Sequence, residues 1–280
     1  MTQSLLYLFA IPQELEAGPM RFLCIFAIPR TGSSHLDKLL RSCPEFNGKS
    51  ELFHRHHVGQ FRKREMKELE ILSGGEVTDA ETFKSWRRQN PLETLEALYE
   101  SGGRRIVVFK VFPNHLPRQI LQAAFFPRND MAFAVLKRRP IESFISSLKA
   151  KSSSTYTLVE TTALKPSLSL GGLQAWARRT RSWYKFTRLA LEARDMPYAQ
   201  ISYGKHLDGK SGEESLAEIL PLLEPAGISG IPIPAEIIEG ERQDKEARYQ
   251  DRVDNWDEFI AEAESDPAHA RLLKWALRDP

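Results

Sequence analysis

Apolar residues fall into short continuous runs that alternate with longer segments of helical periodicity. The runs at 22–28, 106–109 and 131–136 have four to seven residues, which suits strands that are buried on both faces. We expect a fourth strand at 198–203. The segments between them repeat apolar residues at three- and four-residue spacing, the pattern of amphipathic helices. Strands alternating with helices predict an α/β fold of three layers around a central, mostly parallel sheet. We expect a short strand or extended loop at 48–54, and helices near 58–72, 91–99, 116–124, 140–148, 173–194, 213–223 and 256–277.

The chain length of 280 residues allows one large α/β domain or two small ones. We expect one domain over 20–280, preceded at 1–19 by an extension or an extra edge strand. The apolar run at 5–10 follows no basic segment, and Pro12 ends it. This arrangement predicts neither a signal peptide nor a membrane anchor, and no stable membrane insertion.

Composition and charge narrow the classes of function. The formal net charge of +2 gives no electrostatic case for nucleic-acid binding. Basic residues gather at 55–67 and 178–188, and for most of them we favour solvated helix faces over a binding patch. The chain has two cysteines, which indicate neither a disulfide framework nor a metal site. A reduced, cytoplasmic compartment is the resulting expectation.

The first apolar run leads into a small polar turn, Arg30-Thr31-Gly32-Ser33-Ser34, and then into an amphipathic helix. A strand, a Gly-containing loop and a helix N-terminus in this order resemble a phosphate loop, and such a point binds phosphate or sulfate. The loop of nucleotide hydrolases and kinases requires Lys directly after its second Gly, but Ser33 occupies that position here. On this stretch alone, an anion-binding loop and an ordinary turn remain equal alternatives.

Cations follow three of the predicted strands: Arg30, Lys110 and the run 137–139. Ligands of parallel sheets bind beyond the carboxyl ends of the strands, so converging positive charges there predict an anionic ligand. The acidic residues that would hold Mg²⁺ for phosphoryl transfer are missing from these strand ends. We therefore expect a donor that is handled by cations and hydroxyls without a metal.

Two stretches resemble the motifs of the PAPS-dependent sulfotransferases, in particular their bacterial and carbohydrate-type branch. Residues 28–34 are similar to the family's 5′-phosphosulfate loop, and 138–146 to its 3′-phosphate motif, in which an Arg and a Ser eight residues later grip the 3′-phosphate. Weaker similarities lie at 201–203 and 252–256. The resemblance implies a sulfotransferase that moves the sulfuryl group of PAPS to a hydroxyl or amine of a small metabolite, lipid or sugar.

The resemblance also implies roles for individual residues. Arg30 would bind the 5′-phosphosulfate and stabilise the leaving oxygen, and Lys110 would be a second cation on the sulfate. Arg138 and Ser146 would hold the 3′-phosphate, over which Arg242 and Gln243 would close. The remaining loop positions would bind the donor through backbone N–H groups and hydroxyls: Thr31, Gly32, Ser33 and Ser34.

Two residues are candidates for the general base that takes the proton of the acceptor. Glu51 lies about where carbohydrate-type and bacterial sulfotransferases carry a catalytic Glu, and we favour it. His115 is similar to the His of a Lys-Thr-His-Leu-Pro motif in cytosolic relatives, although its distance from Lys110 differs by three residues. The histidines at 54, 56 and 57 we interpret as a solvated stretch and not as a metal site.

Two other functions remain open. A metal-dependent nucleotide kinase uses the same strand, loop and helix, but the missing loop Lys argues against it. A non-catalytic module that binds a nucleotide or another anion needs the same loop and no base. The identity of the acceptor and the oligomeric state stay open, although we expect the loop at 152–172 and the aromatic helix at 173–194 to line the acceptor pocket.

Overall fold

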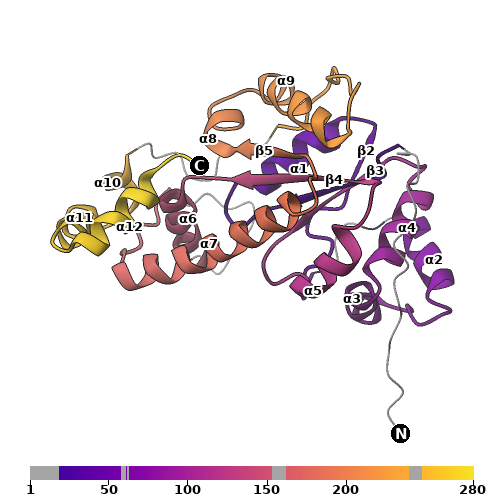
Figure 1. The fold of residues 1–280 in the computed structure, drawn as a ribbon, viewed down its shortest axis with the longest axis horizontal. Helices are drawn as coiled ribbons and strands as arrows, with labels where there is room; N and C mark the ends of the chain where they lie inside the picture. The colour runs from indigo at the N-terminus through magenta and orange to yellow at the C-terminus, as the bar shows by residue number, and fades with distance from the viewer. Residues whose placement is uncertain (1–18, 58–60, 62, 153–161, 240–247) are drawn as a thin grey trace, which may run out of the picture.

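A computed structural model describes residues 19–57, 61, 63–152, 162–239 and 248–280. Five parallel strands form one sheet, in the order β2-β3-β1-β4-β5 (Figure 1). The first strand lies at the centre, where Phe22 is level with Val107 on one neighbour and Met131 on the other. The predicted parallel sheet is confirmed. Its strands are β1 (Phe22–Phe26), β2 (Phe46–Gly48), β3 (Ile106–Val111), β4 (Met131–Lys137) and β5 (Tyr198–Ser202).

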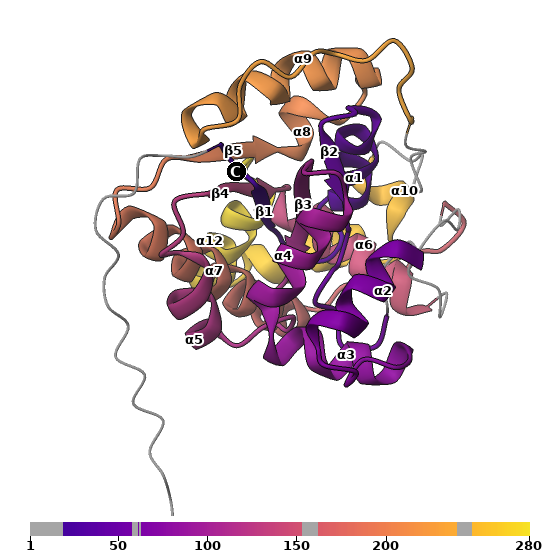
Figure 2. The ribbon, with the colours of Figure 1, turned by 90° about the vertical axis from the view of Figure 1, so that its right-hand side faces the viewer.

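Helices cover both faces of the sheet, because successive side chains of a strand point to opposite sides. Phe22, Cys24 and Phe26 of β1 lie in one apolar cluster, while Leu23 and Ile25 lie in the other. Figures 1 and 2 show α8 and α9 on one side and α7 on the other. The Leu23 side carries α1 (Ser33–Ser42), α8 (Tyr203–His206) and α9 (Gly212–Leu223). The Phe22 side carries α4 (Pro91–Ser101), a π-helix (Leu121–Phe125), α6 (Pro140–Ser152), α7 (Leu170–Glu192), α11 (Trp256–Glu264) and α12 (Pro267–Leu277).

The C-terminal segment corrects one prediction. We expected a single helix over 256–277, but α11 ends at Glu264 and α12 begins at Pro267. The side chain of Asp266 accepts hydrogen bonds from the backbone N–H groups of Ala268 (2.7 Å) and His269 (3.0 Å). An Asp cap followed by Pro at the first helical position starts a new helix, and this local signal overrides the continuing apolar periodicity.

Other element bounds also differ from the expectations. Of the short strand or extended loop expected at 48–54, only Gly48 belongs to a strand, β2 at Phe46–Gly48, and residues 49–54 are not in a strand. One helix that we did not predict, α3 (Ala80–Gln89), begins with a capping box between Asp79 and Thr82. The other helices whose bounds differ from the expected ones, or that we did not expect, are α2 (Lys63–Leu72), α5 (Arg118–Ile120) and α10 (Tyr249–Arg252). Among the helices of the described ranges, none combines the length and the apolarity that crossing a bilayer requires.

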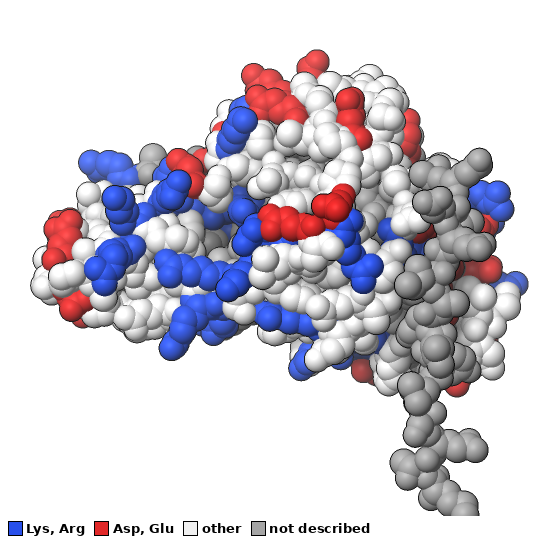
Figure 3. Space-filling view, viewed as in Figure 1, with Lys and Arg blue, Asp and Glu red and all other residues white. Residues whose placement is uncertain are grey.

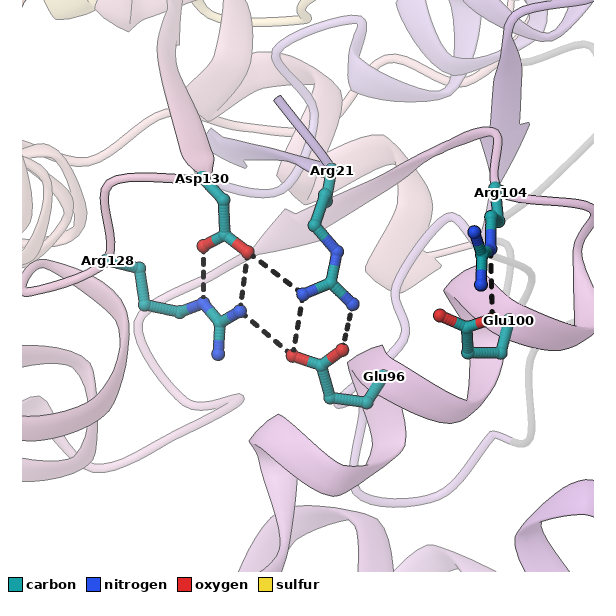
Figure 4. Close-up of polar contacts among 6 residues, drawn as sticks. All are labelled: Arg21, Glu96, Glu100, Arg104, Arg128 and Asp130. Carbon is teal, nitrogen blue, oxygen red and sulfur yellow. Dashed lines mark hydrogen bonds and ion pairs between the residues drawn. The ribbon is translucent and has the colours of Figure 1, made fainter. Parts of the chain in front are cut away.

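A network of charged residues joins α4 to the beginnings of β1 and β4 (Figure 4). Arg21 forms ion pairs with Glu96 and with Asp130, the latter at 3.2 Å. Arg128 is 2.6 Å from Asp130 and 2.9 Å from Glu96. The network therefore lies at the amino ends of the strands, the edge of the sheet opposite to their carboxyl ends.

The basic stretch 178–188 lies on α7. Its cations Arg178, Arg181 and Lys185 are exposed, and Arg188 pairs with Glu192 at 2.6 Å. Figure 3 shows lysines and arginines gathered over this helix. The stretch is thus an exposed helix face; that it is solvated and binds no ligand stays a prediction.

Candidate active site

The loop between β1 and α1 is a tight turn that requires glycine. Gly32 has a φ of 84°, in the left-handed region that a side chain disfavours. A Cβ at this position would lie 2.2 Å from Cδ2 of Tyr203, so the ring of Tyr203 occupies the space next to the turn. No side chain caps the N-terminus of α1, and its first turn has no acidic residue. The first N–H groups of such a helix attract an anion.

Two motifs that are far apart in the sequence meet at this loop. Nε of Arg30 donates to Oγ of Ser146 at 3.0 Å. Nη1 of Arg138 lies 3.5 Å from the carbonyl oxygen of Arg30, and its guanidinium carbon lies 4.2 Å from the ring centre of Tyr203. Tyr203 therefore contacts both the turn at Gly32 and Arg138. The two motifs form one site and do not open onto separate surfaces.

The charges at this junction favour an anion. Burial and the neighbouring positive charge of Arg138 lower the pKa of Arg30. Two guanidinium groups that repel each other become more stable when a negative charge lies between them. Nε of Arg138 donates to Glu142 at 2.9 Å, which fixes its orientation.

Lys110 brings a third cation to the loop from β3. Its side chain is buried, and Nζ lies 3.3 Å from Oγ of Ser34 and 3.9 Å from Oε1 of Glu51. Burial lowers the pKa of Lys110, and the charges of Asp37 and Glu51 act in the opposite direction. Asp37 is buried on α1, and sequence reasoning missed it. The available signal was an acidic residue on the apolar face of that helix, next to Leu36.

Glu51 is held against β3 by the backbone that precedes it. The N–H of Lys49 donates to the carbonyl oxygen of Val108, and the N–H of Lys110 donates to that of Ser50, both at 2.7 Å. These two bonds extend the pairing beyond the end of β2. They place the carboxylate of Glu51 at the carboxyl end of the neighbouring strand.

Two imidazoles face this carboxylate. Nε2 of His115 lies 3.5 Å from Oε2 of Glu51, and Nε2 of His54 lies 4.0 Å from the same atom. Burial raises the pKa of Glu51, but the hydrogen bond from His115 and the charge of Lys110 outweigh it, so the net shift is downward. Burial lowers the pKa of His54 to about 4. At neutral pH the site therefore holds an ionised carboxylate beside a neutral His54.

Backbone N–H groups determine which nitrogen of each imidazole carries the proton. Nδ1 of His54 accepts from the N–H groups of His56 (3.1 Å) and His57 (3.2 Å). Nδ1 of His115 lies 3.3 Å from the N–H of Phe112, which can only donate, and 3.4 Å from the carbonyl oxygen of Lys110. Because the carboxylate of Glu51 can only accept, protonation of Nε2 lets His115 donate to it. In His54, the two N–H groups at Nδ1 leave the proton to Nε2.

Comparison with known proteins identifies the family. The model of the Sulfotransferase family matches residues 23–204, a span that contains the loop, Glu51, Lys110 and both members of the second motif. The chain belongs to the sulfotransferase family. No curated protein matches it.

Solved structures of sulfotransferases resemble the chain at low sequence identity. The sulfotransferase domain from the curacin biosynthetic pathway is 14% identical, with a TM-score of 0.49, over 94% of this chain and 100% of that domain. The domain from the Synechococcus PCC 7002 olefin synthase is 16% identical, with a TM-score of 0.48, over 97% and 92%. The sulfotransferase from Alicyclobacillus acidocaldarius is 14% identical, with a TM-score of 0.44, over 94% and 98%.

In this family member, Glu51, His54 and His115 also have the composition of a metal site. Their ligand atoms lie within 4.8 Å of one another. A metal bound at Nε2 would move the proton of His54 to Nδ1, toward the N–H groups of His56 and His57. The observed hydrogen bonds therefore do not fit a metal at this atom. That the enzyme works without a metal stays a prediction.

The other loop residues that we predicted to bind the donor differ in how deeply they are buried. Thr31 is buried and its hydroxyl donates to the carbonyl oxygen of Ile28 at 2.8 Å. Ser33 is buried and Ser34 is exposed. Arg242 and Gln243 lie outside the described residues.

Sequence reasoning also undervalued two residues of the site. His54 was assigned to a solvated stretch, but only His56 and His57 of that stretch are exposed. Tyr203 was noted as the end of a strand, whereas its ring contacts the loop and Arg138. Neither role has a sequence signal, because each depends on how distant segments meet.

Proposed function

We propose that this chain transfers the sulfuryl group of PAPS to a hydroxyl or amine of a small metabolite, lipid or sugar. The observation that carries the proposal is the meeting of Arg30, Ser146 and Arg138 at the N-terminus of α1. A nucleotide with phosphates on its 3′ and 5′ positions offers two anions, one for each motif. When bound, PAPS supplies a sulfuryl group whose leaving group is a phosphate.

Different residues would bind the two ends of that ligand. The N–H groups at the start of α1, with Ser34, would bind the 5′ end, and Arg138 with Ser146 would bind the 3′-phosphate. Lys110 lies between Ser34 and Glu51, where a positive charge stabilises negative charge that develops during transfer. Arg30 is bonded to Ser146, so we assign it to the junction of both ends.

Of the two candidate bases, we propose Glu51. Its pKa is lowered, so the carboxylate is ready to accept a proton at neutral pH. Nε2 of His115 carries a proton toward that carboxylate in the preferred tautomer, and a protonated nitrogen cannot accept another. His115 and His54 would then orient Glu51 and keep it ionised, and Oε1 or Oε2 of Glu51 would take the proton of the acceptor.

Binding of adenosine 3′,5′-bisphosphate tests the proposal. We expect this nucleotide to raise the melting temperature of the wild type, and Arg138→Ala to abolish the rise. The matched control is Arg104→Ala, which removes an exposed arginine paired only with Glu100 among the described residues (Figure 4). A rise that depends on ATP and Mg²⁺, with none from the bisphosphate, would instead support a kinase.

Turnover is the second test. The protein is incubated with PAPS labelled on sulfur and a metabolite extract, and products are sought by mass spectrometry. We expect a product heavier by one sulfuryl group, absent with Glu51→Gln. Nucleotide binding without any such product would indicate a binding module.

A further inference from the structure

Helix α3 is bonded to both chain segments that present an imidazole to the candidate base. Nε of Arg88 donates to the carbonyl oxygen of His115 at 3.1 Å. Nη2 of the preceding residue, Arg87, donates to the carbonyl oxygens of His54 and His57, the latter at 2.6 Å. Two adjacent side chains in the last turn of one helix therefore hold the backbone behind both imidazoles.

The bonds of Arg87 close the turn from which the ring of His54 extends. Nη2 contacts the carbonyl oxygens at the two ends of the turn 54–57, while two N–H groups of the turn donate to Nδ1 of His54 at 3.1 and 3.2 Å. Backbone and ring are thus fixed together, and Nε2 of His54 lies 4.0 Å from Oε2 of Glu51. A displacement of the Arg87 guanidinium would displace this ring.

Arg88 has the corresponding place behind His115. Its bond ends on the backbone of His115, whose Nε2 lies 3.5 Å from Oε2 of Glu51. Two contacts in series therefore connect Arg88 to the carboxylate. The rings of His54 and His115 also meet edge to face, with their centres 5.4 Å apart, so a displacement of either ring reaches the other.

The helix that carries both arginines is itself anchored. A capping box between Asp79 and Thr82 starts α3. Phe83 and Trp86 of α3 are buried in one apolar cluster with residues of α2 and α4, and Figure 2 shows α3 beside these two helices. Side chains of its last turn therefore extend from a fixed backbone.

Arg87 occupies a buried position that is costly by itself. Its side chain is fully buried, and within the described residues its Nε and Nη1 lack a hydrogen-bond partner. Burial and the charge of Arg88 lower the pKa of Arg87 to about 10. Because a buried charge destabilises a fold unless it is paired, the two bonds from Nη2 are the contribution that offsets this cost. Arg87 therefore acts on the turn 54–57.

We propose that Arg87 and Arg88 are positioning residues for the sulfuryl transfer, which hold the imidazoles of His54 and His115 against Glu51 and so keep its carboxylate oriented toward the acceptor. This inference rests on the proposed function. Neither arginine takes part in the bond changes. The acceptor oxygen or nitrogen loses its proton to Glu51 and bonds to sulfur, while the electron pair of the broken bond between sulfur and the bridging oxygen stays on the phosphate of the donor.

Three substitutions at Arg88 separate its hydrogen bond from its charge. The amide nitrogen of Gln lies as many bonds from Cα as Nε of Arg, so Arg88→Gln keeps a donor and removes the charge. Arg88→Lys keeps the charge but has a CH₂ group at that position, and Arg88→Met lacks both. We expect Arg88→Lys and Arg88→Met to lower the rate at saturating PAPS by up to about 100-fold with an unchanged KM for PAPS, and Arg88→Gln to keep most of the wild-type rate.

The rate is the transfer of label from PAPS, labelled on sulfur, to compounds of a metabolite extract. Arg104→Met is the matched control, because Arg104 is exposed and pairs only with Glu100 among the described residues. A wild-type rate in Arg88→Met overturns the inference and leaves the proposed function standing. Equal losses in all three Arg88 variants also overturn it, since the bond to His115 would then make no difference.

Arg87→Lys is the corresponding test of the turn 54–57. The Lys side chain ends where the guanidinium carbon of Arg lies, one bond short of Nη2, so a buried cation remains while the bonds to both carbonyl oxygens weaken. We expect a lower rate at saturating PAPS with an unchanged KM for PAPS. An unchanged rate contradicts the role of Arg87.

The pH profile distinguishes positioning from a merely structural role. The titratable groups that face the carboxylate of Glu51 are His115, His54, Lys110 of β3 and Asp37 of α1. Burial raises the pKa of Glu51, and the hydrogen bond from His115 opposes it, so weakening that bond raises the pKa. The rate of Arg88→Met should therefore fall as pH decreases from 7 to 5, where the wild type and Arg88→Gln stay level. A wild-type profile in Arg88→Met would mean a structural role only.

Donor binding shows whether the effect is confined to the base. The melting-temperature rise with adenosine 3′,5′-bisphosphate should persist in every variant of Arg87 and Arg88, because Arg138 and Ser146 lie on other elements. Loss of this rise together with turnover would mean that the substitution disturbs the whole site, which contradicts a positioning role at Glu51. A wild type without turnover contradicts the proposed sulfotransferase activity, and the inference with it.

Discussion

Replacing Gly32 by alanine tests whether the packing of the loop against Tyr203 holds the site together. The substitution meets two obstacles, a φ of 84° and a Cβ position 2.2 Å from Cδ2 of Tyr203. The left-handed conformation costs about 1–2 kcal/mol. Overpacking against a buried ring adds roughly 1–3 kcal/mol, because Tyr203 must move and its contact with Arg138 moves with it. We expect a total loss on the order of 2–5 kcal/mol.

The chain offers a matched control at Gly74. This residue has a φ of 63°, but nothing lies within 4 Å of the position where its Cβ would be. Gly74→Ala therefore bears only the conformational cost, about 1–2 kcal/mol. The difference in unfolding free energy between the two variants, measured by urea denaturation, isolates the contact with Tyr203.

Ligand binding gives a second readout of the same perturbation. We expect Gly32→Ala to lose the melting-temperature rise with adenosine 3′,5′-bisphosphate, and Gly74→Ala to keep it. Equal losses of stability in the two variants would refute the packing argument. An undiminished ligand effect in Gly32→Ala would refute the role of the turn in binding.

Three further predictions concern the base and the charged network. Glu51→Gln should lower kcat by about 10²–10⁴-fold, measured with labelled PAPS, while nucleotide binding stays intact; an unchanged kcat would exclude Glu51 as the base. Because the pKa of Glu51 is lowered from 4.5, the rate should stay level as pH falls from 7 to 5; a decline within this interval would contradict an ionised Glu51 as the base. Arg128 and Arg21 outweigh burial and lower the pKa of Asp130, so its stabilising effect is present above about pH 4 and is lost below it. Asp130→Asn should therefore cost about 1 kcal/mol in urea unfolding at pH 7 and less at pH 3.5; an equal cost at both would contradict this assignment.

The sheet could be predicted because its strands carry their signal in their own residues. The run from Phe22 to Ile28 is buried throughout, and continuous burial on both faces leaves a continuous apolar run in the sequence. The sequence also predicted that Arg30, Lys110 and Arg138 lie at one edge of the sheet, because the carboxyl ends of parallel strands are on the same side. The family prediction is confirmed by the match over residues 23–204. The use of PAPS, the assigned site residues and the cytoplasmic location stay predictions.

The remaining features depend on contacts between segments that are far apart in the chain. Nothing in the local sequence of Arg87 indicates that its guanidinium reaches the carbonyl oxygen of His57. The break between α11 and α12 was missed for a different reason. Its signal, Asp266 followed by Pro267, is local, but the apolar periodicity that continues across it was given more weight.

The ring of Tyr203 has a consequence for ligands that resemble only half of the donor. Since the ring contacts both the turn at Gly32 and the guanidinium of Arg138, we expect a displacement of the ring to affect both predicted anion positions. Adenosine monophosphates that carry one phosphate, at the 3′ or the 5′ position, should bind more weakly than the bisphosphate, because each engages only one of the two positions. A site of this kind would favour a doubly phosphorylated nucleotide over a singly phosphorylated one.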